Sequence, residues 1–160
     1  MKLTSYQASG FRLLNGPNVG GLISYPVHAA TTIVKGEALN DDTVGYAINT
    51  GIDFASIFLG IAAEPCDNSA GAVGAKDVLV IPPLPQYQWS VPVDGNALIT
   101  RTIVGVLIDL GADAGHVAIN DNPTEGWAFK VEDFDASAEA IAAHAFGYAI
   151  GRILQIGTAA

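Results

Sequence analysis

The residues that could do acid–base, nucleophilic or metal chemistry are few and scattered along the 160-residue chain. The three histidines, His28, His116 and His144, lie far apart, whereas a zinc site needs clustered ligands such as His-x-x-x-His or Cys-x-x-Cys. The single Cys66 is followed by Asp67, whose negative charge disfavours a reactive thiolate. The pattern predicts no catalytic residue, no metal centre and no cofactor.

The spacing of the acidic residues bears on calcium binding and on sugar hydrolysis. Asp41-Asp42 and Asp121-Asn122 lack the alternating Asp residues, the Gly and the Glu of an EF-hand, although a calcium site of another kind in a β loop stays open. Glu132 and Asp133 are neighbours on an expected strand, so they point to opposite faces and do not form a glycosidase pair. No nucleophile elbow, P-loop or dinucleotide fingerprint is present. We therefore expect a protein that is not an enzyme.

Charge and composition limit the classes of partner. The net charge is −9, from 16 acidic residues against 7 Lys and Arg, too few cations for a patch that binds nucleic acid or an anionic membrane. Hydrophobic residues make up 50% of the chain and charged residues only 14%. This is more apolar surface than one small core needs, so we expect burial against other chains in an oligomer or a larger assembly.

The sequence also suggests where the chain is made. Residues 1–7 lack the apolar segment of a signal peptide, and no apolar run has the length of a membrane span. With a single cysteine the chain forms no internal disulfide. We expect synthesis in a cytoplasm without an export signal.

Most of the chain consists of short apolar runs separated by Gly, Pro, Asn and Asp, at the spacing typical of strands and turns. We expect about nine to eleven short strands in an all-β fold, either a small barrel or a sandwich. One short alanine-rich helix is expected near 136–145, capped by Asp135 or Ser137. No alternation of strands and helices indicates a parallel α/β fold.

Proline and glycine mark the connections. Pro26 favours an edge or an entry position for the strand within 22–28, and Gly60 favours a bulge or a close approach within 54–63. The composition of 65–75 is typical of a loop. The prolines at 82–85 favour a structural connector, with a PxxP-type ligand as the alternative.

An internal repeat is visible in the sequence. The segment 34–39 recurs in compressed form at 93–98, and 57–61 recurs at 103–107. A Gly/Asp loop and another strand-like run follow in both places. The pattern predicts a doubled β unit that acts as a scaffold for the remaining segments.

Residues 1–22 have no clear periodicity and contain several glycines, so we expect an extended N-terminal arm before a single β domain over 23–160. The arm is either partly disordered or ordered by docking on a neighbouring chain. In the second case its contact residues are expected to be Phe11, Arg12, Leu13 and Leu14.

Two aromatic-rich stretches alternate as strands do. Tyr87 and Trp89 share one strand face, and Trp127 and Phe129 share another. If these rings are exposed, they would form a platform on which sugars stack. If they are buried, they would pack in the core or in a subunit interface. The alternation favours packing.

A family resemblance rests on segments that occur in a fixed order: apolar-x-Gly-x-Ala-Leu, a turn, Gly-Tyr-Ala, Phe-Leu-Gly-Ile-Ala-Ala-Glu, Asp-Asn-Ser-Ala-Gly and Val-Leu-Val. They lie at 34–39, 45–47, 58–64, 67–71 and 78–80, and two later segments, 129–131 and 147–152, are similar to closing strands. Through these segments the chain resembles the small decoration (cement) and head-fibre-like proteins of tailed-bacteriophage capsids. The resemblance covers most of residues 30–156.

The resemblance implies a β-rich homotrimer on the outer surface of an icosahedral virion, where it bridges major capsid protein subunits and stabilises the capsid. It implies no active site and no cofactor. The interface is expected among Phe11, Arg12, Leu13, Leu14, Tyr87, Trp89 and Trp127. The alternative is a non-enzymatic β-rich module that binds glycan or protein, with Tyr87, Trp89 and Trp127 in the site.

Overall fold

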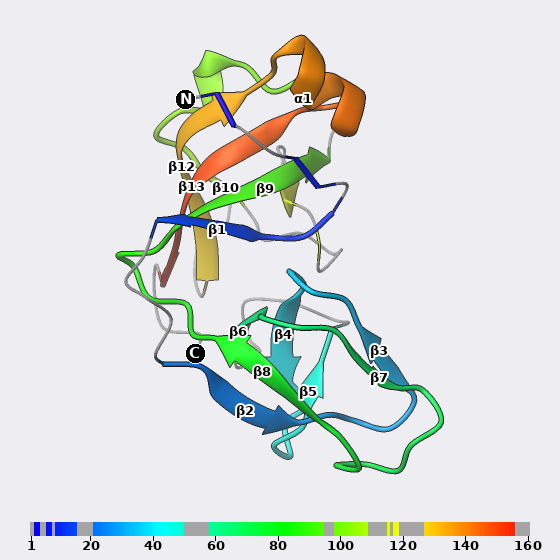
Figure 1. Cartoon of the computed structure of the whole chain (residues 1–160). Helices are drawn as coiled ribbons and strands as arrows, with labels where there is room; N and C mark the ends of the chain where they lie inside the picture. The colour runs from blue at the N-terminus through cyan, green and yellow to red at the C-terminus, as the bar shows by residue number, and fades with distance from the viewer. Residues whose placement is uncertain are drawn as a thin grey trace.

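The computed structural model of the chain describes residues 2–3, 6–7, 9–15, 21–49, 58–94, 98–108, 115, 117–118 and 127–155. Over these residues the protein is mostly β-strand, as predicted, and its two main sheets lie one above the other in a sandwich-like arrangement (Figure 1). Each main sheet runs from one end strand to another, so neither closes into a barrel within the described residues.

The upper sheet contains six strands. Their bounds are β1 Arg12–Asn15, β9 Gln88–Asp94, β10 Leu107–Ile108, β11 Val117–Ala118, β12 Trp127–Asp135 and β13 Tyr148–Gln155. The order is β1-β9-β13-β12-β10, and β11 pairs with β9. Only β11 pairs in parallel; the other ladders of this sheet are antiparallel. The longest strands, β12 and β13, therefore lie in the middle of the sheet.

The lower part contains a five-stranded sheet and a two-stranded ladder. The bounds are β2 Ile23–Pro26, β3 Thr31–Ile33, β4 Ala38–Asp41, β5 Ala47–Ile48, β6 Phe58–Ala62, β7 Cys66–Asn68 and β8 Asp77–Ile81. The five strands follow the order β2-β8-β6-β4-β5, and β3 pairs with β7. Strand β2 is an edge strand, which confirms the position that Pro26 predicts.

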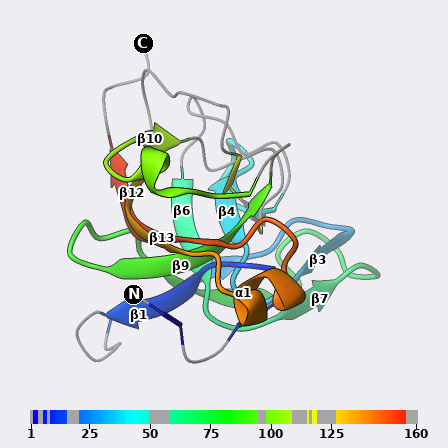
Figure 2. The ribbon, with the colours of Figure 1, turned by 90° about the horizontal axis from the view of Figure 1, so that it is seen from above.

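The largest core cluster fills the space between the two sheets. In Figure 2, seen from above, β4 and β6 of the lower sheet appear beside β9 and β12 of the upper sheet. The cluster takes apolar side chains from these four strands: Trp89, Val91, Val93, Phe129 and Val131, with Ala38, Phe58 and Ile61. Trp89 and Phe129 are wholly buried, so the predicted alternation of both aromatic strands is confirmed. Since one cluster draws on both sheets, the two layers share a core.

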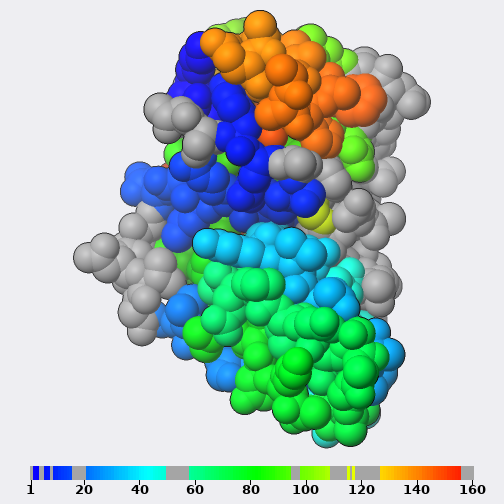
Figure 3. Space-filling view, turned by 45° about the vertical axis from the view of Figure 1, so that its right-hand side comes forward, coloured from blue at the N-terminus to red at the C-terminus, as the bar shows by residue number. Residues whose placement is uncertain are grey.

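The described N-terminal residues cover the outer face of the upper sheet. Leu3 is buried there with Ala140, Tyr148 and Ile150, and Tyr6 packs against this cluster. Figure 3 shows the N-terminal segment in blue between the end of the molecule that carries the helix and the lower sheet. Both faces of the upper sheet are thus covered.

The predicted helix is confirmed as α1, Ala138–Ala143. Its N-cap is Ser137, whose Oγ accepts a hydrogen bond from the Ala140 backbone N–H at 3.3 Å. The helix has under two turns, and Ala140 is its buried residue, so packing on the sheet stabilises it. No helix among the described residues has the length and apolar content to cross a membrane.

The predicted N-terminal arm needs correction. Residues 12–15 form strand β1, which pairs antiparallel with β9, and Phe11 is 3% exposed in the central core. The arm is ordered on its own chain because its large apolar residues alternate: Leu13 packs on the central core and Leu14 on the outer cluster.

The two copies of the sequence repeat adopt different structures. Residues 38–41 and 58–62 are strands β4 and β6, whereas Arg101–Ile103 forms a short 3-10 helix, η1, followed by a turn. The sequence similarity reflects shared apolar-Gly-apolar composition, which also fits a turn at Gly105 with its φ of +89°. Within the expected loop 65–75, the structure adds strand β7, which the sequence did not indicate.

Candidate functional site

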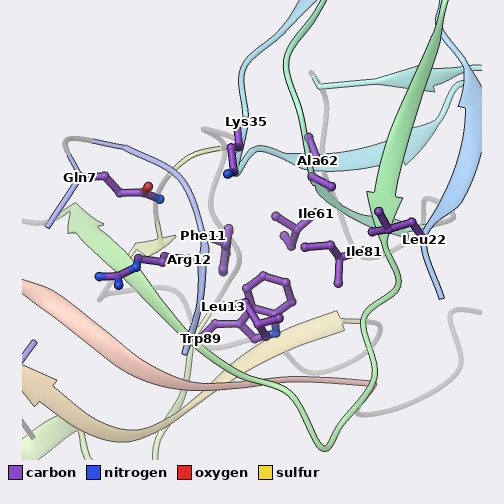
Figure 4. A pocket seen from close by; sticks show the side chains of 11 residues that line it. Gln7, Phe11, Arg12, Leu13, Leu22, Lys35, Ile61, Ala62, Ile81 and Trp89 are labelled. Carbon is purple, nitrogen blue, oxygen red and sulfur yellow. The ribbon is translucent and has the colours of Figure 1, made fainter. Parts of the chain in front are cut away.

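A groove opens between the upper sheet and the lower sheet (Figure 4). Its cavity volume is about 420 Å³, within the usual range of ligand-binding pockets. The upper wall is formed by Phe11, which directly precedes β1, by Arg12 and Leu13 of β1, and by Trp89 of β9. Four of the seven predicted interface residues are therefore brought together at one site.

The lower wall of the groove comes from the other sheet. Ile61 and Ile81 contribute aliphatic surface from β6 and β8, and Leu22 lies at the lip, 37% exposed. The exposed side chain of Lys35, from the turn between β3 and β4, also lines the groove. The sequence did not predict these lower-wall residues, because they come together only in the tertiary structure. Lys35 is one of only seven Lys and Arg residues in the chain, and that rarity was the one feature that could have marked it as a candidate.

Phe11 is a structural residue of the upper wall. Its ring lies edge-on to Trp89, with centroids 6.3 Å apart, and to Phe129 at 6.0 Å. The expectation that Phe11 docks on a neighbouring chain is corrected, because its side chain is already buried against its own core. Leu14 lies on the opposite face of β1 and takes no part in the groove.

The remaining aromatic candidates also belong to the core. Tyr87 and Trp89 are 4% and 0% exposed, and the ring of Trp127 packs on Phe58 with centroids 5.4 Å apart. A sugar-stacking platform built from Tyr87 and Trp89 is therefore excluded, since stacking needs an exposed ring face. The indole Nε1 of Trp89 has no hydrogen-bond acceptor among the described residues.

The acid–base candidates are spread over the molecule. His28 Nε2 lies 3.7 Å from Asp42 Oδ2, and His144 Nε2 lies 3.9 Å from Asp94 Oδ1; His116 lies outside the described residues. No group of three or more His, Cys, Asp or Glu is placed to hold a metal ion in the described part of the chain.

The Asp41-Asp42 pair shapes a turn. Asp42 Oδ1 accepts hydrogen bonds from the N–H groups of Val44 (3.0 Å) and Tyr46 (3.1 Å), and Asp41 Oδ1 accepts one from Gly45 (2.9 Å). Burial alone would raise the pKa of Asp42, but the Tyr46 and Val44 N–H groups hold it below its ordinary value. The Asp121-Asn122 pair lies outside the described residues.

Glu132 has a structural partner. Its Oε1 accepts a hydrogen bond from Arg152 Nε at 2.6 Å, and its Oε2 accepts one from Gln88 Nε2 at 2.9 Å. A register shift between Val131 and Asp133 places Glu132 at a bulge in β12. The carboxylate thereby ties together side chains of β9, β12 and β13, in agreement with a structural role.

Cys66 is predicted to react slowly in the folded protein. The thiol is buried, and this burial is the main cause that raises its pKa. The nearby ammonium of Lys76 lowers the pKa, and the carboxylates of Glu64, Asp67 and Asp77 raise it further. Alkylation by iodoacetamide is expected to be at least about tenfold slower in the native protein than in urea. Mass spectrometry of timed samples measures both rates, and equal rates would contradict the placement of Cys66 inside β7.

Comparisons with known proteins attach no family to this groove. No protein-family model matches the chain, and no curated protein matches its sequence. The groove is therefore defined by the structure alone.

Proposed function

We propose that the chain is a structural, non-enzymatic protein that decorates the outer surface of a tailed-phage capsid and stabilises it by bridging major capsid protein subunits. The resemblance in segments 34–39, 58–64 and 67–71 supplies the family. The sandwich-like β fold is compatible with that family and supports the proposal at the level of architecture.

The observation that carries the proposal is the exposed aliphatic surface beside the edge strands. Ile23 on β2 is 43% exposed, Val44 just before β5 is 72% exposed, and Val106 just before β10 is exposed as well. Among the described residues, β2 and β10 end their sheets, whereas β5 ends its sheet but also bridges to Val27 through Ala47. An edge strand flanked by exposed aliphatic groups favours association with other protein surfaces.

The charge of the chain supports an outer position on the virion. With a net charge of −9, the protein is repelled by packaged nucleic acid and suits the outside of the shell. The alternative glycan-binding function loses its best candidates, because Tyr87 and Trp89 are buried. Protein binding is therefore the function that we favour.

The proposal predicts oligomerisation and capsid binding. The purified chain is expected to elute as a trimer at micromolar concentration in size-exclusion chromatography with light scattering. It is also expected to co-sediment with capsids assembled from the major capsid protein of the same genome. Val106→Lys or Ile23→Lys is expected to weaken one of these associations about tenfold, since each places a charge beside an edge strand.

Ile141→Lys is the matched control. Ile141 is also exposed but lies on the helix α1 rather than beside β2, β5 or β10, so its variant is expected to behave as the unmodified protein. A stable monomer that stays in the supernatant when capsids are pelleted would overturn the proposed function.

A further inference from the structure

One edge of β1 pairs with β9, and the other edge faces the groove. The Phe11 N–H donates to Gly36 O at 2.7 Å, and the Gly36 N–H donates to Ala62 O at 2.9 Å. The edge of β1 that does not pair with β9 therefore faces the turn at Gly36 and strand β6, which both line the groove. Successive residues of a strand direct their backbone groups to opposite edges. The Leu13 N–H and C=O therefore face the same side as the Phe11 N–H.

A strand edge beside an apolar groove is the arrangement that accepts an additional strand. On β1 the backbone groups of Leu13 are the ones to pair, because the Phe11 N–H is already bonded to Gly36 O. The backbone edge supplies hydrogen bonds, and pockets beside it accept alternate side chains of the incoming segment. Here the side chains of Leu13, Ile61 and Ile81 form the apolar lining (Figure 4).

The charged group that faces the groove is the ammonium of Lys35, whereas the side chain of Arg12 points away from the apolar lining (Figure 4). None of the described lining residues is acidic, although acidic residues outnumber Lys and Arg by 16 to 7 in the sequence. A segment that carries carboxylates is attracted to this local positive potential, and a basic one is repelled.

We propose that this groove binds an extended peptide segment of a partner protein, with aliphatic side chains alternating with acidic ones, as an added strand on β1. The aliphatic side chains occupy the lining formed by Leu13, Ile61 and Ile81, and a carboxylate pairs with the ammonium group of Lys35. The inference does not depend on the partner being a capsid protein, so it stands apart from the proposed function.

The test uses a fluorescein-labelled peptide of sequence Asp-Val-Asp-Val-Asp and the full chain. Fluorescence anisotropy is expected to saturate, and Lys35→Glu is expected to weaken binding at least about fivefold because it reverses the charge at the groove. Lys130→Glu is the matched control, since Lys130 is exposed on β12 and lies outside the groove, and it is expected to bind as the unmodified chain does.

Two further probes separate an added strand from simple charge attraction. A peptide with the same side chains but N-methylated at alternate residues lacks the N–H groups for a ladder and is expected to bind about tenfold more weakly. In NMR spectra, the acidic peptide is expected to shift the Leu13 amide signal and the indole N–H signal of Trp89.

Several outcomes would overturn the proposal. They are equal binding of the acidic peptide and of Lys-Val-Lys-Val-Lys, equal binding of the N-methylated peptide, the absence of saturable binding, and shifts confined to the α1 face. A self-association that Lys35→Glu abolishes while the peptide fails to bind would instead assign the groove to a second copy of this chain. Circular dichroism of each variant verifies folding before binding is compared.

Discussion

Replacing Gly151 with alanine is expected to lower the free energy of unfolding by about 3–5 kcal/mol. Gly151 lies in β13, between β9 and β12, and a Cβ atom built on it would lie 1.9 Å from Lys130 O and 2.9 Å from Lys130 C. It would also lie 3.1 Å from Cε1 of the buried Phe129 ring. Since the obstructing atoms are mostly backbone in a central strand, relief requires a shift of β12 against β13.

Urea unfolding followed by tryptophan fluorescence measures this loss, as a lower midpoint at an unchanged slope. Gly21→Ala is the matched control, because a Cβ atom at Gly21 meets no other atom within 4 Å. That variant is expected to change stability by no more than about 0.5 kcal/mol. If the two variants unfolded at the same urea concentration, the close approach of β12 and β13 at Gly151 would be refuted.

Local sequence patterns predicted the parts of the fold that local chemistry determines. Ser137 caps the helix as expected, and Trp89 and Phe129 lie on the buried faces of strands that alternate in sequence. The close approach predicted at Gly60 is confirmed: its φ is +134°, and a Cβ atom there would lie 2.2 Å from Ile81 O. Each of these features depends on neighbours within a few residues or on one steric constraint.

Other features depended on partners far along the chain. Strand β1 pairs with residues of β9 some 75 positions later, so the short apolar run at 11–14 could not show by itself that it forms a strand. The groove has the same origin, since Lys35, Ile61 and Trp89 come from three separate elements. The sequence repeat predicted two similar β units, which was wrong. In short segments interrupted by glycine, composition determines neither which strands pair nor their register.

Replacing Asp135 with asparagine is expected to cost about 2–3 kcal/mol at neutral pH and to loosen the N-terminal segment. The Asp135 carboxylate is almost wholly buried and accepts three hydrogen bonds. Its Oδ2 accepts from the Leu3 N–H at 2.8 Å and from the Tyr6 hydroxyl at 2.7 Å, and its Oδ1 accepts from the Ser137 N–H at 3.0 Å. It therefore joins the N-terminal segment to the start of α1.

The effect of the substitution is expected to depend on pH. Burial alone would raise the pKa of Asp135, but the N–H groups of Ser137 and Leu3 and the Tyr6 hydroxyl lower it from 3.8 to about 2. Because folding lowers this pKa, the ionised carboxylate stabilises the folded state at every pH above about 4. That contribution is lost as the pH falls from about 4 toward 2, where the carboxyl becomes protonated in both states.

The difference in stability between the unmodified protein and Asp135→Asn should accordingly be constant from pH 7 to about pH 5 and shrink toward pH 2. Urea midpoints across this range measure it, with Glu64→Gln as a control because Glu64 is exposed. Hydrogen exchange of the Leu3 amide separates local from global effects: faster exchange with a small change in the urea midpoint would mean that the segment detaches alone. If the difference in stability between the two proteins stayed unchanged down to pH 2, Asp135 would act by packing. The proposed role requires the difference to shrink in acid, because protonation removes the ionised hydrogen-bond acceptor.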